Sequence, residues 1–172
     1  MTRARLDPFR PVAQAIGMSR DGALVRLVPM STDLAADLGA ALAAIDPWAR
    51  VALGPETMTR FLAATESGAV RYAIQLDDAV AGALVVRHPW LHGPYVQLIG
   101  LKPAFQGRGL GEVALRWLES EVKDRFRNVW LCVSAVNGDA QRFYERHGFM
   151  LAGRLDSLVF DGFDELLLRK RV

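Results

Sequence analysis

The segment Gln106-Gly107-Arg108-Gly109-Leu110-Gly111 lies between an apolar run expected to form a strand, Tyr95–Leu101, and the most regular helical pattern in the chain, Leu110 to about Phe126. Glycines let a backbone adopt positive φ values and approach a ligand closely. The start of the following helix presents unpaired N–H groups and the positive end of the helix dipole. The segment therefore predicts an anion-binding loop suited to a diphosphate.

Three interpretations of this loop compete. The simplest is a glycine-rich turn without a ligand. A Rossmann dinucleotide site needs GxGxxG and an acidic residue after the next strand, whereas this chain has GxGxG and Ser134-Ala135-Val136. A Walker loop needs Gly-Lys-Ser/Thr, which is absent from the segment. The spacing favours an anion-binding loop of another kind, with Arg108 and Lys102 as candidates for positive charge at its rim.

Periodicity around the loop predicts the order β-α-α-β-β-β-α-β-α-β-β. The unit Tyr95–Val133 should be a parallel β-α-β crossover in an otherwise antiparallel sheet, which is an α/β fold with a mixed sheet. His88–Pro94 is expected to be a loop and Gly100 a candidate bulge. The remaining expected elements are strands Leu24–Pro29, Val70–Gln75, Val80–Arg87, Phe149–Leu155 and Asp164–Arg169, and helices from Ser31 or Thr32 to Ile45, from Pro55 to near Gly68 and from Asn137 to near Gly148.

Composition and charge exclude several classes of protein. The 172 residues fit one domain, and a net charge of +2 is too small to indicate a nucleic-acid partner. No apolar run approaches the ~20 residues that span a bilayer, and no signal-peptide pattern opens the chain, so we expect a cytoplasmic protein without a membrane partner. Residues 1–22 are predicted to be a flexible N-terminal arm, and residues 23–172 a single domain. Cys132, inside an apolar run, is expected to be a buried hydrophobe.

Two motifs together carry a family resemblance. Gln106-x-x-Gly109-x-Gly111 resembles the Q/R-x-x-G-x-G/A signature of the GNAT superfamily of acyl-CoA-dependent N-acetyltransferases. Asn137-x-x-Ala140-x-x-Phe143-Tyr144-x-x-x-Gly148-Phe149 resembles the segment after the fifth strand of that family, at the usual separation. The resemblance covers about residues 24–170. It implies the GNAT fold, a central, mostly antiparallel sheet of about seven strands with one parallel β-α-β crossover and a splayed strand pair.

The resemblance also implies acetyl-coenzyme A as co-substrate and no metal. The pantetheine arm should pair with the backbone of Ile99, Gly100 and Leu101, as an added strand would. Asn137 should contact the pantetheine, although a helix N-cap alone would also explain it. The residues expected to hold the pyrophosphate are Gln106, Gly107, Arg108, Gly109, Leu110 and Gly111.

The implied reaction is direct attack of a primary amine on the thioester. Tyr144 should act as general acid for the coenzyme A sulfur, although a packed aromatic is the alternative. Many relatives carry a Glu base on the fourth strand, where this chain has Tyr95. His88 and His92 are candidate bases, directly or through water, and each is also explained as an ordinary loop histidine.

The acceptor is expected to be a small-molecule or peptide amine. Its pocket should include Trp48, Trp90, Tyr95 and Gln97, although loop packing explains the aromatic residues equally well. The sequence leaves open whether the protein is a monomer or a homodimer. The main alternative function is a non-catalytic coenzyme A-binding or regulatory module, because no carboxylate base is evident.

Overall fold

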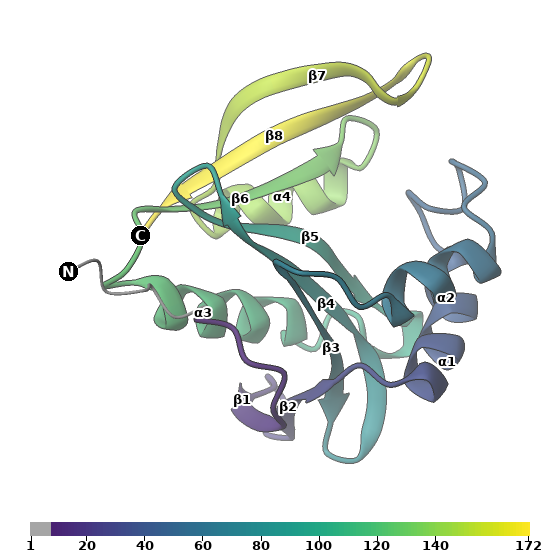
Figure 1. The fold of residues 1–172 in the computed structure, drawn as a ribbon, viewed down its shortest axis with the longest axis vertical. Coiled ribbons are helices and arrows are strands. Elements are labelled where there is room, and N and C mark those ends of the chain that lie inside the picture. Colours follow the sequence, from purple (N-terminus) through teal and green to yellow (C-terminus); the bar gives the residue numbers. More distant parts are fainter. Residues whose placement is uncertain (1–7) are drawn as a thin grey trace.

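The computed structural model describes residues 8–172, and within them eight strands form one open sheet in the order β1-β2-β3-β4-β5-β6-β8-β7 (Figure 1). The strands are β1 (Gln14–Met18), β2 (Leu24–Pro29), β3 (Ala69–Leu76), β4 (Ala79–Trp90), β5 (Gly93–Leu101), β6 (Asn128–Ser134), β7 (Met150–Phe160) and β8 (Phe163–Arg171). The helices are α1 (Thr32–Ala43), α2 (Pro55–Ala63), α3 (Leu110–Val122) and α4 (Gly138–Arg146), with a short 3-10 turn at Pro103–Phe105.

Local sequence signals explain where several elements begin. The Ser31 side chain accepts a hydrogen bond from the Leu34 N–H at 3.2 Å and caps α1. Pro55 occupies the first turn of α2, where a missing N–H costs nothing. Both helix starts were predicted, whereas α2 ends at Ala63, well before the expected Gly68. No helix in residues 8–172 is long and apolar enough to cross a membrane.

Two apolar cores cover the two faces of the sheet (Figure 1). On one face, α3 and α4 pack on strand residues such as Leu27, Tyr72 and Leu131. On the other face, α1 and α2 pack on residues such as Ala83 and Leu98. Because helices cover both faces of the sheet, functional groups can meet a ligand only at the loops, at the strand ends or at a gap in the sheet.

Strands β5 and β6 form the parallel pair of the sheet, and they diverge along their length (Figure 1). The recorded pairs are Tyr95 with Trp130 and Val96 with Leu131, although β5 continues to Leu101. This divergence confirms the predicted parallel crossover and splayed strand pair. It leaves the β6-facing backbone groups of the second half of β5 without strand partners.

A bulge lies just where the two strands begin to diverge. Along β4, Val85 pairs with Leu98 and Val86 pairs with Val96, so Gln97 is the extra residue on β5. The prediction of a bulge at Gly100 was wrong. Gly100 has a different role, because a Cβ there would come within 2.9 Å of the Trp48 ring.

The prediction of a flexible arm over residues 1–22 was wrong for the described residues 8–22. Strand β1 pairs with β2 and adds the eighth strand to the expected seven or so. Phe9 is 3% exposed in the core, and the Tyr72 hydroxyl donates to the Arg10 carbonyl at 2.8 Å. A five-residue strand shows too little periodicity to be found from sequence. Residues 1–7 lie outside the described residues.

The prediction of a loop over His88–Pro94 was also wrong, because most of these residues belong to the two strands of a hairpin. Strand β4 runs to Trp90 and β5 begins at Gly93, with Trp90 paired to Gly93. The prolines and glycine that suggested a loop lie in the last irregular pairs, where the register shifts between Arg87 and Trp90.

The packing of Phe9 predicts a large effect of its removal. Its ring lies edge-on to Trp117, with ring centroids 6.0 Å apart. Phe9→Ala should lower the free energy of unfolding by about 3–5 kcal/mol, measured by urea unfolding. The control Val12→Ala, at a half-exposed position in the same segment, should change it by less than about 0.5 kcal/mol. Equally small effects of both substitutions would contradict the burial of this segment.

Candidate active site

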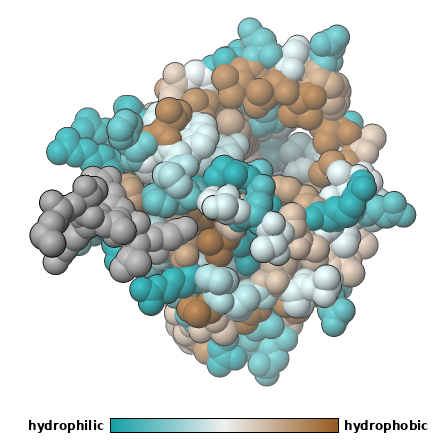
Figure 2. Space-filling view, viewed as in Figure 1, coloured by the Kyte–Doolittle hydropathy of each residue, from teal (hydrophilic) through white to brown (hydrophobic). Residues whose placement is uncertain are grey.

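A cavity of about 650 Å³ opens where β5 and β6 diverge. Figure 2 shows the surface hollowed between the β7–β8 hairpin and the side of α1 and α2, with apolar residues gathered on the hairpin. The walls come from both faces of the sheet, because the lining includes the α1–α2 link on one side and α3 and α4 on the other. The cavity therefore passes through the gap in the sheet.

The glycine-rich loop forms one end of this cavity. All its residues except Arg108 line the cavity. Gly109 is the N-cap of α3 with a φ of +84°, and no side-chain cap satisfies the first turn of the helix. The Gln106 side chain donates to the Leu101 carbonyl at 3.0 Å and ties the loop to the end of β5. A helix end without a side-chain cap leaves N–H groups that suit an anion, and anion binding at this loop stays a prediction.

The two basic residues predicted at the rim of the loop point elsewhere. The Arg108 guanidinium forms an ion pair with Asp21 in the β1–β2 turn. The Lys102 ammonium forms an ion pair with Asp37 of α1 at 2.6 Å. Both side chains hold neighbouring segments together and neither lines the cavity, so their role at the rim stays a prediction.

Arg20 supplies the positive charge that lies at this end of the cavity. It lines the cavity, its Nη1 donates to the Gly107 carbonyl at 3.4 Å, and its backbone N–H donates to the Arg108 carbonyl at 3.0 Å. Glu112 lies 3.5 Å from its guanidinium. Sequence reasoning missed Arg20 because the expected arm concealed the β1–β2 turn, and only tertiary structure brings that turn to the loop.

The strand walls of the cavity contain polar groups that lack partners. Ile99, Gly100 and Leu101 line the cavity, as predicted for the residues that would pair with a pantetheine arm. The residues Gln97 and Ser134 also line it, and their atoms Gln97 Oε1 and Ser134 Oγ are buried without a hydrogen bond to the rest of the described chain. Because buried polar atoms are normally hydrogen-bonded, these positions fit a ligand with amide and carbonyl groups.

Helix α4 places the second motif against the same cavity. Asn137 Oδ1 accepts from the Ala140 N–H at 3.1 Å and caps α4, which leaves its amide NH₂ for a ligand. Tyr144 lines the cavity and is 7% exposed, with its ring edge-on to Phe143 and Phe149. Burial raises the pKa of the Tyr144 phenol above its ordinary value, so the group stays protonated at neutral pH.

The opposite end of the cavity contains most of the predicted acceptor residues. Trp48, Tyr95 and Gln97 line it, whereas Trp90 lies outside and packs on Tyr95 with ring centroids 4.8 Å apart. Asp46 also lines the cavity and forms an ion pair with Arg50 at 2.8 Å.

The two candidate histidine bases lie in a different place. His88 and His92 line a separate pocket of about 490 Å³ beside Phe126. His88 is 8% exposed, with its ring centroid 4.6 Å from that of Phe126. Because neither ring reaches the larger cavity, the prediction of a histidine base does not fit the structure.

Sequence reasoning missed a carboxylate in the cavity, Glu165 of β8. It is half-buried, and burial raises the pKa of its carboxyl. Burial is also the main cause of the raised pKa of the Tyr95 phenol, to which Cys132 and Glu165 contribute. The Cys132 thiol, which also lines the cavity, has a pKa raised by burial, which argues against a thiolate nucleophile. No local sequence pattern marks Glu165, because its place depends on pairing between β8 and β6.

The model of the acetyltransferase (GNAT) family matches residues 40–149 of this sequence, which contain both motifs. The chain belongs to this family. The eight-stranded mixed sheet with its splayed pair is accordingly a GNAT fold, as the resemblance implied.

Individual proteins named as acetyltransferases match parts of the chain. It is 32% identical over 92 residues to streptothricin acetyltransferase of Streptomyces lavendulae, which covers 52% of this chain and 48% of that protein. It is 36% identical over 84 residues to acetyltransferase Atu2258 of Agrobacterium fabrum, covering 48% and 58%. The chain thus spans about half the length of the curated relatives it matches. Mycobacterium smegmatis RimJ, solved in complex with CoA-disulfide, shares the fold at a TM-score of 0.71 and 16% identity, covering 94% of this chain and 88% of that one.

The loop geometry of this GNAT chain predicts a specific loss of coenzyme A affinity. Gly107 has a φ of +76° and Gly162, in the β7–β8 turn, a φ of +84°, and a Cβ at either would meet open space. Replacement by Ala at either position should therefore cost about 1–2 kcal/mol of stability through backbone strain alone. Calorimetry should show weaker coenzyme A binding for Gly107→Ala and unchanged binding for the matched control Gly162→Ala. Equal affinities of the two variants would refute binding at the loop.

Proposed function

We propose that this chain is an N-acetyltransferase that moves an acetyl group from acetyl-CoA to a primary amine by direct attack. The observation that supports this most strongly is one cavity that joins an open helix N-terminus to an aromatic and acidic pocket through the gap between β5 and β6. The first end suits a diphosphate and the second suits a cationic amine. Membership of the GNAT family supports the same reaction class.

The residues that would hold acetyl-CoA follow from this arrangement. The loop of residues 106–111 and the Arg20 guanidinium would bind the diphosphate, through backbone N–H groups and charge. The backbone of Ile99–Leu101 and the Asn137 amide would hydrogen-bond to the pantetheine arm. When bound there, acetyl-CoA supplies an activated acyl group as a thioester. A backbone N–H near Ile99 would then stabilise negative charge on the carbonyl oxygen.

Tyr144 would donate a proton to the sulfur that leaves. Its hydroxyl lies in the cavity wall on α4, the helix that Asn137 caps. Because burial raises its pKa, Tyr144 remains protonated at neutral pH and can donate its proton there. Cys132 is not required, since direct attack needs no covalent enzyme intermediate.

The acceptor would be a cationic primary amine. Trp48 and Tyr95 offer aromatic faces in the pocket, and the carboxylate of Glu165 offers negative charge, whereas that of Asp46 is paired with Arg50. The name of the Streptomyces lavendulae relative makes streptothricin the first compound to test, beside spermidine, a lysine-containing peptide and a peptide with a free N-terminus.

A thiol-release assay with this panel tests the proposal. The purified chain should release coenzyme A from acetyl-CoA in the presence of at least one of these amines. Absence of release, together with a rise in melting temperature on adding coenzyme A, would favour a non-catalytic coenzyme A-binding module instead. Absence of both effects would reject the proposal altogether.

The role of Tyr144 predicts a loss of turnover without a loss of binding. Tyr144→Phe removes only the hydroxyl and keeps the ring packing on Phe143 and Phe149, so kcat should fall about 10²–10⁴-fold with unchanged coenzyme A affinity. The control Tyr72→Phe makes the same change at a buried ring outside the cavity lining and should leave kcat unchanged. A Tyr144→Phe enzyme with the wild-type kcat would exclude the general acid.

A further inference from the structure

We propose that Glu165 binds the ammonium group of the acceptor and takes its proton before attack. This inference rests on the proposed function, and it assigns the base that neither histidine can provide from its position. Four features of the structure support it: the position of Glu165 in the cavity, the face of the sheet it occupies, its lack of a cationic partner, and its relation to Tyr144.

Strand pairing places Glu165 at the mouth of the gap in the sheet. It lies directly opposite Ser134, the last residue of β6, and both residues line the cavity. Residues directly opposite each other in an antiparallel pair project from the same face. The Ser134 hydroxyl oxygen is buried without a hydrogen bond to any described residue, so a polar group bound beside Glu165 would find a second partner there.

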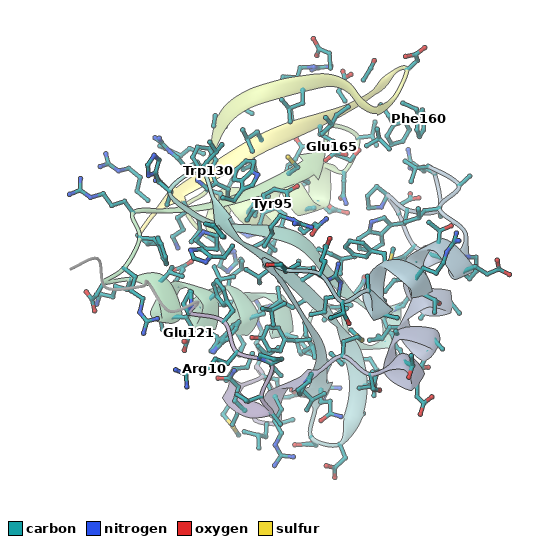
Figure 3. The ribbon with its side chains drawn as sticks, in the orientation of Figure 1. Arg10, Tyr95, Glu121, Trp130, Phe160 and Glu165 are labelled. Carbon is teal, nitrogen blue, oxygen red and sulfur yellow. The ribbon has the colours of Figure 1, made fainter. Side chains whose placement is uncertain are left out.

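Glu165 shares its face of the sheet with Tyr95. Alternation along β6 puts Cys132 and Ser134 on the face opposite to Leu131 and Val133, which belong to the core beneath α3. Tyr95 and Glu165 both line the cavity, and the charge of Glu165 contributes, after burial and Cys132, to the raised pKa of the Tyr95 phenol. Figure 3 shows Tyr95 on β5 and Glu165 on β8, the two strands that flank β6.

No cation in the described chain neutralises Glu165. Within residues 8–172, Glu165 forms no ion pair, although its carboxylate is half-buried. On β7, Arg154 is occupied by Asp156 and Asp164, and across the cavity Arg50 is occupied by Asp46. Arg146 of α4 also lines the cavity, but no ion pair joins it to Glu165. The titratable groups that do approach Glu165 are neutral when protonated, namely Tyr95 of β5 and Cys132 of β6. A half-buried carboxylate without a cation fits an incoming ammonium group.

Glu165 and Tyr144 lie on opposite sides of the sheet. Tyr144 packs in the core beneath α3, whereas Glu165 projects from the face that α1 and α2 cover further along the sheet. Both line the one cavity that crosses the sheet through the gap. A base on one side and an acid on the other suit a reaction in which the nucleophile enters from one face and the leaving group departs toward the other.

The proton balance of this arrangement closes without a further reactant. An alkyl amine with a pKa of about 10 arrives as an ammonium ion and gives one proton to Glu165, directly or through water. The nitrogen lone pair forms the C–N bond with the acetyl carbon as the C–S bond breaks, and Tyr144 gives its proton to the sulfur. The second proton leaving the nitrogen returns to the Tyr144 oxygen through water. Glu165 releases its proton to solvent, so one amide, one thiol and one H⁺ result.

Carboxyl NMR tests this site without any turnover. In protein with ¹³C-labelled Glu side chains, a signal that disappears in Glu165→Gln should titrate above the ordinary Glu value of about 4.3. Adding n-propylammonium chloride, a fragment common to polyamine and lysyl acceptors, should shift this signal saturably and lower its pKa, because a nearby cation favours the carboxylate. A signal that ignores the amine at every concentration would overturn the proposal.

Kinetics against pH separates a base from a merely structural carboxylate. Glu165→Gln should lower kcat/KM about 10²–10⁴-fold at pH 7 with unchanged coenzyme A affinity. The loss should shrink as the pH rises past about 10, the pKa of the amine, because the acceptor then becomes neutral without a base. The control Glu121→Gln makes the same change on α3, away from the cavity (Figure 3), and should behave as the wild type.

The outcomes distinguish this inference from the proposed function. Two results would overturn the role of Glu165 alone, provided that the wild-type enzyme turns over. The first is that Glu165→Gln has the wild-type activity at pH 7, and the second is that it loses activity equally at all pH values. A wild-type protein that acetylates none of the panel amines contradicts the proposed function, whatever the NMR titration shows.

Discussion

The divergence of β5 from β6 is the constraint on which the rest of this structure depends. Two parallel strands that stay paired would close the sheet and bury their backbone groups in the ladder. Here the recorded pairing ends at Val96 and Leu131, so the following β5 residues face a cavity instead of a strand. Buried backbone groups need partners, and this need makes the gap a natural site for an extended ligand with amide groups.

The same divergence lets one cavity reach both faces of the sheet. The N-terminus of α3, which suits an anion, lies on one face of the sheet. The carboxylate of Glu165, which suits a cation, lies on the face of α1 and α2. The bulge at Gln97 shifts the side-chain alternation of β5, so Val96 and Ile99 pack toward α3 whereas Leu98 packs toward α1. The one cavity thereby joins the uncapped N-terminus of α3 to the wall that contains Glu165.

The features predictable from sequence were those encoded locally. The loop at residues 106–111 and the capping Asn137 are short motifs, and the crossover between them follows from strong periodicity. Glu165 could not be found in this way, because its place depends on the register between strands distant in sequence. Arg20 was missed for a similar reason, since a short edge strand brings it to the loop. His88 shows the converse error: its residue type suggested a base, but it lies in a pocket separate from the cavity.

Hydrogen exchange on β5 tests most directly the claim that the splayed strand receives the cofactor. Exchange rates of amides Gln97–Leu101 would be measured by NMR with and without acetyl-CoA, with the β2–β3 pair as internal reference. The account predicts that cofactor slows exchange at the amides of β5 and in the loop after it, and leaves those of β2 and β3 unchanged. Slowing confined to other strands, or unchanged rates on β5 at saturating cofactor, would contradict it.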